Sequence, residues 1–424
     1  MIEPRRSRQI TLPYGTSRLE IDVPSDATIV TPAHWPAVGD EVGAVRSALE
    51  HPVGGRPLRD LVPRGARVAI SVCDATRPQP RQPMLAAIAQ VLEITRPGDV
   101  VVLIATGTHV TSTEAQRRDM LGDDILERWR VVDHDARDTA SLRRLGVIDG
   151  VPVLLNREWV DADVRITTGF VEPHFFAGFS GGPKMVAPGL AGLETVLELH
   201  SPARIADPRA TFAVVEGNPV HDAVRAIAAA TGVTFSVDVL IDDKHRITHA
   251  FGGPVLEMHA VACQTARQVA MQAVRRPFDI IITTNSGYPL DRNLYQAVKG
   301  MAAAAMVVAD GGTIICAAEC RDGLPGDGPY ARLLDSGATI SDVAARLLAA
   351  GHTIPDGWQV QVQASVQARA RVLLYSGLPE STVRAAHLEP IADVSRTLEE
   401  LLARRPNARV CVLPEGPQTI PYLA

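Results

Sequence analysis

The chain has 424 residues, of which 46% are hydrophobic and 21% charged, and its formal net charge is −6. This length exceeds one ordinary domain, and the composition is that of a soluble globular protein. The negative charge gives no electrostatic reason to expect a nucleic-acid partner, and no apolar run approaches the ~20 residues that span a bilayer.

The first part of the chain predicts strands that alternate with helices. Residues 1 to about 30 alternate in polarity as strands do, for example in ITLPYG and LEIDVP. Continuous apolar runs then predict buried strands, and helical patterns follow them: strands at 66–72, 99–106, 165–170 and 234–242, helices at 83–94, 111–121 and 220–231. Thr111 and Glu114 have the spacing of a capping box. Continuous apolar strands between helices predict a mostly parallel sheet covered on both faces.

The rest of the chain predicts a second unit of the same kind. A helical pattern ends near Arg275 and Arg276, and a strand, a helix beginning near Asp291 and further strands follow. We therefore predict an α/β fold with two domains of mostly parallel sheets. The predicted boundaries are an N-terminal domain at 1–275, a C-terminal domain at 276–405, and a terminal strand in 406–424 that returns to the N-terminal domain.

Cysteine usage and the N-terminus favour a cytoplasmic location. The five cysteines are odd in number and scattered, as reduced thiols are, and we expect Cys316 and Cys320 to be core residues. The N-terminal basic residues precede no apolar segment, so they do not resemble a signal peptide. We expect no membrane partner.

Residues 166–201 carry the densest group of motifs. A short strand breaks at His174, and a glycine-rich loop leads to Lys184. A helical pattern from about Leu193 then ends at His200. The loop is not a triphosphate cradle, because Pro183 stands where that motif needs its second glycine and Met185 where it needs a hydroxyl.

Other polar residues follow predicted strands. Asp74 and Arg77 come after the strand at 66–72, His109 after the next, and His174 after the strand at 165–170. Ligands bind at the carboxyl ends of the strands in such sheets, so this placement is what a site predicts. It is also where polar loop residues lie by default. On the helix near Asp291, Tyr295, Gln296 and Lys299 occupy neighbouring positions.

Three histidines, His109, His174 and His200, allow a zinc-hydrolase reading, in which three protein ligands leave one position open. Their spacing is unlike that of H-E-x-x-H, and this reading gives the glycine loop and Lys184 no role. Seven other histidines are interpreted as polar surface without a role: His134, His221, His245, His249, His259, His352 and His387.

Five motifs together resemble the nickel-pincer lactate racemase family. They are DATRP at 74–78, TGTH at 106–109, PHFFAGFSGGPKMVAPGLAG at 173–192, LELHS at 197–201 and YQAVKG at 295–300. The resemblance spans most of the chain, and both spacing and residue type agree. It implies a two-domain fold whose active site lies in the interdomain cleft.

The resemblance also implies a cofactor, the nickel-pincer nucleotide (Ni(II)-pyridinium-3,5-bisthiocarboxylate mononucleotide). Lys184 would bind it covalently and His200 would bind nickel, while His109 and His174 would be the paired catalytic acid and base. Residues Asp74, Ala75, Thr76 and Arg77 would contact the cofactor, and Arg77 would also meet the substrate. Tyr295, Gln296 and Lys299 would bind substrate, and Trp358 would line the pocket.

Racemising a 2-hydroxy acid gives these residue types a physical reason. The C–H bond next to a carboxylate is too weakly acidic for a side-chain base alone, so the cofactor would accept the hydrogen as hydride while a base takes the hydroxyl proton. The two enantiomers of the substrate present their hydroxyl groups on different sides, so two bases are needed. Histidine suits both because it titrates near neutral pH. Arginine and lysine would hold the carboxylate.

The sequence thus predicts an isomerase, a racemase or epimerase of a lactate-like or malate-like 2-hydroxy acid. Its partners would be the small-molecule substrate and the enzymes that mature the cofactor. Arg292 and Arg321 are candidates to bind a second carboxylate such as that of malate. Two alternatives remain: the zinc-type hydrolase, and a non-catalytic protein that binds a nucleotide or the nickel cofactor.

Overall fold

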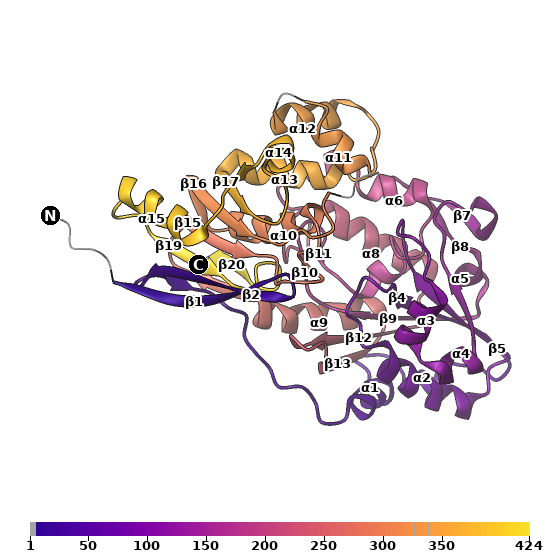
Figure 1. The fold of residues 1–424 in the computed structure, drawn as a ribbon. Helices are drawn as coiled ribbons and strands as arrows, with labels where there is room; N and C mark the ends of the chain where they lie inside the picture. Colours follow the sequence, from indigo (N-terminus) through magenta and orange to yellow (C-terminus); the bar gives the residue numbers. More distant parts are fainter. Residues whose placement is uncertain (1–5, 325–327, 338) are drawn as a thin grey trace. The chain divides into compact units, whose positions relative to one another are not determined.

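Two separate six-stranded sheets organise the chain in this computed structural model, which describes residues 6–324, 328–337 and 339–424 (Figure 1). Each sheet belongs to its own unit. The central unit is formed by His34–His200 and Asp207–Val269. The terminal unit, so called because it contains both chain ends, is formed by Met1–Ala33, Ser201–Ala206 and Ala270–Ala424.

The sheet of the central unit has the strand order β13-β12-β9-β4-β5-β6. The neighbours are parallel except for the β12–β13 pair, which is antiparallel. The strands are β4 (Arg67–Cys73), β5 (Asp99–Ala105), β6 (Arg130–Asp133), β9 (Val164–Phe170), β12 (Phe235–Ile241) and β13 (Ile247–Gly253). Ile70, Val102 and Ile166 in its middle are fully buried, because helices cover both faces.

Those covering helices lie on opposite sides of the sheet. Figure 1 shows α1 (Glu41–Glu50) and α2 (Arg81–Thr95) on one side of β4, β9 and β12, and α8 (Pro219–Thr231) on the other. The other helices are α3 (Glu114–Leu121), α4 (Asp123–Arg128), α5 (Arg157–Asp161), α6 (Leu193–Leu199) and α9 (Val255–Ala270). Smaller pieces are the hairpins β7 (Leu142–Ile148) with β8 (Val151–Asn156) and β10 (Pro173–His174) with β11 (Gly178–Phe179), and 3-10 turns at Leu58–Asp60, Thr139–Ser141 and Gly182–Met185.

The sheet of the terminal unit has the order β18-β17-β16-β15-β19-β3, and all its described pairs are parallel. Its strands are β3 (Thr28–Ile29), β15 (Phe278–Thr284), β16 (Val308–Ala317), β17 (Ala370–Tyr375), β18 (Glu389–Pro390) and β19 (Val410–Leu413). A hairpin of β1 (Ser7–Tyr14) and β2 (Ser17–Pro24) packs Leu12 and Ile21 into one core with Ile280 and Ile282. The strands β14 (Met271–Val274) and β20 (Ile420–Leu423) form a separate parallel pair.

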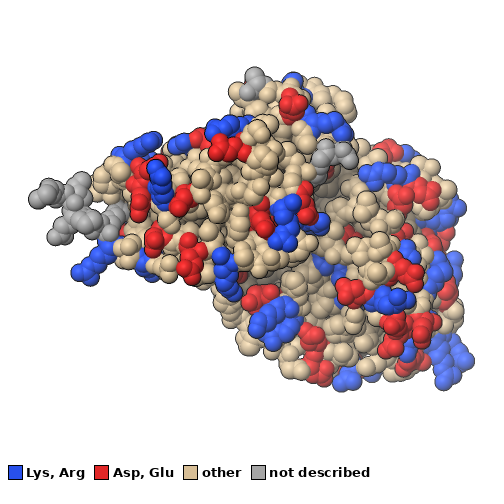
Figure 2. Space-filling model, in the orientation of Figure 1, with Lys and Arg blue, Asp and Glu red and all other residues tan. Residues whose placement is uncertain are grey.

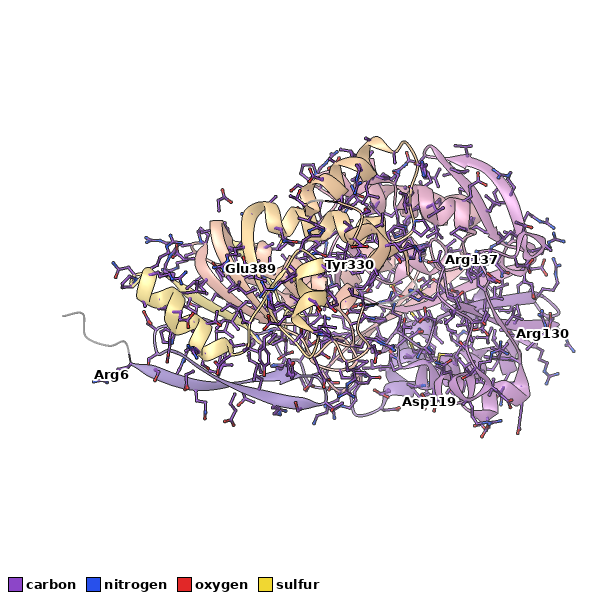
Figure 3. All side chains as sticks on the ribbon, turned by 45° about the horizontal axis from the view of Figure 1, so that its top comes forward. Arg6, Asp119, Arg130, Arg137, Tyr330 and Glu389 are labelled. Carbon is purple, nitrogen blue, oxygen red and sulfur yellow. The ribbon has the colours of Figure 1, made fainter. Side chains whose placement is uncertain are left out.

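Helices complete the terminal unit: α7 (Pro202–Ala206), α10 (Leu294–Ala305), α11 (Pro329–Leu334), α12 (Ile340–Ala349), α13 (Gly357–Arg369), α14 (Glu380–Ala385) and α15 (Val394–Arg404). Tyr330 of α11, labelled in Figure 3, is fully buried, and its hydroxyl donates to Gln363 Oε1 of α13 at 2.7 Å. On the face in Figure 2, acidic and basic side chains are interspersed. Among the described residues, no helix has both the length and the apolar character needed to cross a lipid bilayer.

The predicted α/β class with mostly parallel sheets is confirmed, but the domain limits differ. The N-terminal hairpin belongs to the terminal unit, whereas the prediction placed it in a domain of residues 1–275. The final strands were predicted to return to the N-terminal domain. Instead β19 pairs with β15 and β20 with β14, all within the terminal unit. Hydrophobic strands of equal character fit either sheet, so the sequence pattern alone does not choose between them.

Local predictions differ in detail. The helix expected to end near Arg275 ends at Ala270, and the strand β14 follows. The capping box of α3 uses Thr113 and Gln116, two residues later than the pair predicted from spacing. All five cysteines are buried and free, as expected for reduced thiols.

Candidate active site

The predicted strand-end residues converge on one edge of the central sheet. Strands β9, β4 and β5 are parallel neighbours, so their carboxyl ends lie side by side. Asp74 to Arg77 follow β4, His109 follows β5, and His174 follows β9. This is the edge where ligands bind in open α/β sheets.

The segment that carries Lys184 packs at the same edge of the sheet. Met185 accepts a hydrogen bond at its carbonyl from Ser71 Oγ at 2.9 Å, and its sulfur lies 3.6 Å from Cys73 Sγ. Gly107 N–H donates to the Gly189 carbonyl at 3.0 Å. The glycine-rich segment therefore contacts the carboxyl end of β4 and the loop after β5.

Asp74 and His109 form a direct pair. Asp74 Oδ2 lies 2.8 Å from His109 Nδ1, and Asp74 Oδ1 accepts from the Thr76 amide at 2.7 Å. Burial alone would raise the pKa of Asp74, but His109, Arg77 and the Thr76 hydroxyl together hold that pKa well below its usual value. An ionised carboxylate can only accept hydrogen bonds, so His109 carries a hydrogen on Nδ1. When the ring is neutral, its lone pair is therefore on Nε2.

Arg81, which the sequence reasoning missed, fixes the loop that holds Asp74. This buried arginine donates to the backbone carbonyls of Cys73 (2.8 Å), Gln79 (3.1 Å) and Arg77 (2.9 Å), and also to that of Asp74. Ala75 and Thr76 are exposed and Arg77 is partly exposed. Of the predicted cofactor-contacting residues, Asp74 is therefore buried beside the Arg81 guanidinium, and Ala75, Thr76 and Arg77 are the more exposed ones. Arg137, labelled in Figure 3, similarly donates to the Thr108 carbonyl beside His109 at 3.2 Å.

The ring of Phe176 is the common neighbour of three predicted site residues. His174 meets it edge-on with the ring centroids 4.6 Å apart, and His200 does so at 5.3 Å. Lys184 Nζ lies over the same ring, 5.9 Å from its centroid. Phe176 is itself buried. The aromatic run HFFAGF is visible in the sequence. The sequence does not show, however, which residues contact each aromatic ring.

His200 has the form that a metal ligand requires. Its Nδ1 lies 2.7 Å from the Val196 carbonyl, which only accepts, so Nδ1 carries the hydrogen and the neutral ring has its lone pair on Nε2. Burial, assisted by the charge of Lys184, lowers the pKa of His200 to about 4, so the ring is neutral at physiological pH. A metal-binding histidine commonly donates its other N–H to a backbone carbonyl in this way.

His174 has the opposite arrangement. The amide of Ala177 donates to His174 Nδ1 at 3.2 Å. An amide N–H only donates, so this Nδ1 holds a lone pair and the hydrogen of the neutral ring lies on Nε2. His109 and His174 therefore differ in the nitrogen that bears the hydrogen.

The glycines of the loop are required by its close packing. A Cβ on Gly182 (φ +47°) would lie 2.5 Å from the ring of His259, and one on Gly181 (φ +74°) would lie 2.8 Å from Asp238 Oδ2. Asp238 is fully buried and accepts from the Gly182 amide at 2.6 Å. Burial raises the pKa of Asp238 to about 7, although the amides of Gly182 and Gly169 oppose that rise.

Three histidines that were predicted to be polar surface are buried instead. His134, His221 and His259 are almost fully enclosed in the central unit. His259 Nε2 donates to the Ser180 carbonyl at 2.8 Å, and His221 Nδ1 donates to the Ala177 carbonyl at 3.0 Å, so both support the glycine-rich loop. Burial lowers the pKa of His259 to about 4 and that of His221 to about 3. Single histidines on helices carry no sequence signal for such contacts.

The predicted substrate residues lie together within the terminal unit. Tyr295, Gln296 and Lys299 are partly exposed in the first turns of α10. Trp358, at the start of α13, donates from Nε1 to Tyr295 Oη at 2.9 Å. Arg292 and Arg321 are paired with Asp322 and Glu319 at 2.7 and 2.8 Å, so both guanidinium groups already have carboxylate partners.

The side chains of the candidate site fit a tethered, metal-containing cofactor better than a metal ion held by protein side chains alone. In the described part of the chain, no three histidine, cysteine or carboxylate side chains come close enough to hold a metal ion, so His109, His174 and His200 do not form a zinc site there. His200, whose Nδ1–H is given to a backbone carbonyl, could provide one metal ligand through Nε2, and a metal-containing cofactor would have to bring the remaining donors. The glycine-rich loop, with Lys184 beside Phe176, fits a metal-containing cofactor that is attached to the lysine.

Family models and solved structures agree on where this chain belongs. The model of the lactate racemase N-terminal domain matches residues 14–213, and that of the lactate racemase C-terminal domain matches residues 273–420. The lactate racemase of Thermoanaerobacterium thermosaccharolyticum is 34% identical over 97% of this chain and 98% of its own. That of Lactiplantibacillus plantarum is 33% identical over 89% of this chain and 90% of its own.

The structural comparison gives the same result. The lactate racemase apoprotein from Thermoanaerobacterium thermosaccharolyticum superposes with a TM-score of 0.93 at 33% identity, covering 98% of this chain and all of that one. A Thermotoga maritima protein shares the fold at 17% identity, with a TM-score of 0.67 over 91% of this chain and 99% of its own. The chain therefore belongs to the lactate racemase family and is an isomerase of that family.

Proposed function

We propose that this protein racemises lactate, or a closely related 2-hydroxy acid with one carboxylate, using a nickel-pincer nucleotide bound covalently to Lys184. The observation that carries the proposal is the grouping of His174, Lys184 and His200 around the single ring of Phe176. The two relatives named lactate racemase support the same substrate.

The residues around Phe176 would hold the cofactor. Lys184 would provide the amine that is acylated, and His200 would bind nickel through Nε2, because its Nδ1–H is already given to Val196. The loop from Asp74 through Ala75 and Thr76 to Arg77 would contact the nucleotide. When bound, the cofactor supplies an acceptor for the hydrogen on the carbon next to the carboxylate.

The histidines would move the hydroxyl proton. His109 has its lone pair on Nε2 and an ionised carboxylate behind it, so it can take a proton at Nε2 while Asp74 stabilises the resulting cation. His174 would act as the acid/base group for the opposite enantiomer of the substrate. Two such groups are needed because the two enantiomers present their hydroxyl groups on different sides.

Substrate binding would depend on cations and on α10 and α13. Arg77 and Lys299 would hold the carboxylate, and Tyr295, Gln296 and Trp358 would contact the remaining atoms. A dicarboxylic acid such as malate needs a further cation. The two sequence candidates, Arg292 and Arg321, already have carboxylate partners, which favours a substrate with one carboxylate.

Maturation enzymes would be required to build and load the cofactor, and the protein would work in the cytoplasm. The test is therefore production of the full chain together with such enzymes, followed by intact mass, nickel analysis and interconversion of L- and D-lactate. We expect an added mass, one nickel per chain and racemisation. Malate should be converted far more slowly than lactate.

Single substitutions distinguish attachment of the cofactor from the racemisation step. Lys184→Ala should remove both the added mass and turnover. Lys299→Ala should keep the mass and lose turnover, and His109→Asn and His174→Asn should behave likewise. A matured wild-type sample with no adduct and no nickel would overturn the proposal. An adduct without turnover on any 2-hydroxy acid would instead indicate a non-catalytic cofactor-binding protein.

A further inference from the structure

The loop between β15 and α10 determines where α10 begins. The predicted substrate residues Tyr295, Gln296 and Lys299 lie in the first turns of that helix. Residues 285–293, which precede it, form neither helix nor strand. Such backbone has no regular ladder of hydrogen bonds of its own, so its course depends on contacts with other segments. The placement of the three side chains therefore depends on what holds this loop.

Asp291 joins the loop to two segments that are distant in sequence. The residue is fully buried, and its Oδ2 accepts from the Gly15 amide at 2.7 Å and from the Glu319 amide at 3.0 Å. Gly15 lies in the turn of the β1–β2 hairpin, and Glu319 follows β16. The Asp291 carbonyl also accepts from the Cys320 amide at 3.0 Å. One residue therefore holds three segments of the terminal unit together.

The hairpin turn is packed closely into this junction. Gly15 has a φ of +53°, and a Cβ on it would overlap Glu319 Oε2. Its carbonyl accepts from the amide of Tyr288, in the loop before α10, at 2.8 Å. Arg321 donates to Thr16 Oγ1 at 3.1 Å and pairs with Glu319 at 2.8 Å. The hairpin turn therefore has a fixed place against the loop before α10.

The contacts of this junction continue into α10. Just after Asp291, Asn293 caps the helix by accepting from the Gln296 amide at 3.0 Å. The Leu294 amide donates at 3.2 Å to the carbonyl of Gly323, in the loop after β16. The first turn of α10 is therefore tied to the same loop that Asp291 holds.

We propose that Asp291 is a positioning residue, which fixes the start of α10 through backbone contacts and thereby places Tyr295, Gln296 and Lys299 for the substrate. Backbone amides only donate, so the two amides at Oδ2 need the acceptor that this side chain supplies. Its other oxygen, Oδ1, is buried without a hydrogen-bond partner among the described residues. Stability alone does not favour that arrangement, since an unpaired buried oxygen is costly. The effect on substrate rests on the proposed function, whereas the anchoring of α10 does not.

Hydrogen–deuterium exchange of the full chain without cofactor tests the anchoring. Asp291→Asn keeps one oxygen but puts an NH₂ group where Oδ1 has no partner, and Asp291→Ala removes the acceptor. Peptides that cover residues 285–300 should exchange about 5- to 10-fold faster in Asp291→Asn, because local opening becomes easier, and faster still in Asp291→Ala. If Asp291→Ala does not fold, Asp291→Asn decides the question. Unchanged exchange of these peptides in folded Asp291→Asn would overturn the proposal.

Steady-state kinetics of matured Asp291→Asn test the consequence for the substrate. A displaced α10 weakens contacts that are made to the substrate both before and during the reaction, so KM for lactate should rise about 5- to 10-fold with kcat nearly unchanged. The added mass should remain, since Lys184 lies in the central unit. A lower kcat with an unchanged KM would contradict the positioning of the substrate residues.

The matched control is Asp279→Asn. Asp279 lies near the start of β15, where it also accepts from an amide distant in sequence, that of Arg409 at 2.9 Å, and pairs with Arg405 at 3.3 Å. This variant should leave KM and the exchange of residues 285–300 unchanged. Equal effects of the two substitutions would overturn the proposal. If the wild type carries no adduct and shows no turnover, the proposed function fails, while the exchange measurement still decides whether Asp291 anchors α10.

Discussion

At the scale of single residues, one atom distinguishes the three histidines of the candidate site. Nδ1 faces a carboxylate in His109, a carbonyl in His200 and an amide in His174. The first two partners accept and the third donates, so the lone pair of the neutral ring lies on Nε2 in two of these residues and on Nδ1 in the third. The same residue type thereby has three different hydrogen-bonding environments at the candidate site.

Asp74→Asn should uncouple His109 from its carboxylate. The amide cannot stabilise a cationic ring, and its NH₂ group can hold the ring in the wrong tautomer, so we expect kcat to fall by about 10²-fold or more. KM for lactate should change little. Steady-state kinetics with both enantiomers measure this in matured enzyme.

Asp163→Asn is the control for that experiment. Asp163 pairs with Arg67 at 3.1 Å on an exposed part of the central unit, and exposed pairs contribute little to stability. Equal losses of kcat in both variants would contradict a specific role for Asp74.

At the scale of elements, the glycine-rich loop depends on what lies beneath it. His259 from α9, Asp238 from β12 and His221 from α8 all contact its backbone, and each is buried. The loop therefore sits on a polar layer rather than on an apolar one. Its shape, and with it the position of Lys184, depends on those hydrogen bonds.

Gly182→Ala should destabilise the protein by about 2 to 4 kcal/mol, because its Cβ would meet His259 and its φ is positive. Gly54→Ala is the matched control, since Gly54 has a φ of +70° and nothing within 4 Å of its Cβ position. That variant should lose only about 1 kcal/mol. Denaturant unfolding measures both values, and equal losses would show that the contact with His259 is unimportant.

The contact between α10 and α13 is a second element-level feature. Trp358→Phe and Tyr295→Phe each remove one partner of the bond between Nε1 and Oη. A double-mutant cycle on unfolding free energy should give a coupling of about 1 kcal/mol. Purely additive losses would mean that the bond contributes nothing to stability.

At the scale of the whole molecule, buried titratable groups link stability to pH in opposite directions. His259 binds a proton below about 6.5 when unfolded but only near pH 4 when folded, so its contribution to stability is lost as pH falls through that interval. Asp238 keeps its proton up to about pH 7 when folded but ionises near 3.8 when unfolded, so its contribution is lost as pH rises.

Asp238→Asn should therefore gain stability relative to the wild type as pH rises. Between pH 5 and pH 7 the difference between the two proteins should shift by about 2 to 3 kcal/mol in favour of the variant, at 1.36 kcal/mol per pH unit. Unfolding free energies measured at the two pH values test this. A difference that is the same at both pH values would mean that Asp238 is already ionised in the folded protein at pH 5.

Much of the fold followed from local pattern. The continuous apolar strands predicted parallel sheets, and β4, β5, β9 and β12 lie where the pattern placed them, because a strand covered on both faces must be apolar throughout. The strand-end positions of Asp74, His109 and His174 followed from the same reasoning. The helix ending at His200 was likewise readable, since α6 ends at Leu199.

The sequence by itself determined the fold class, the family and the residue types that the chemistry needs, because these depend on periodicity and motif spacing along the chain. Only the tertiary structure decided which sheet received the terminal strands, and only it showed that Phe176, Arg81 and Asp238 support the site. Those roles depend on contacts between residues far apart in sequence.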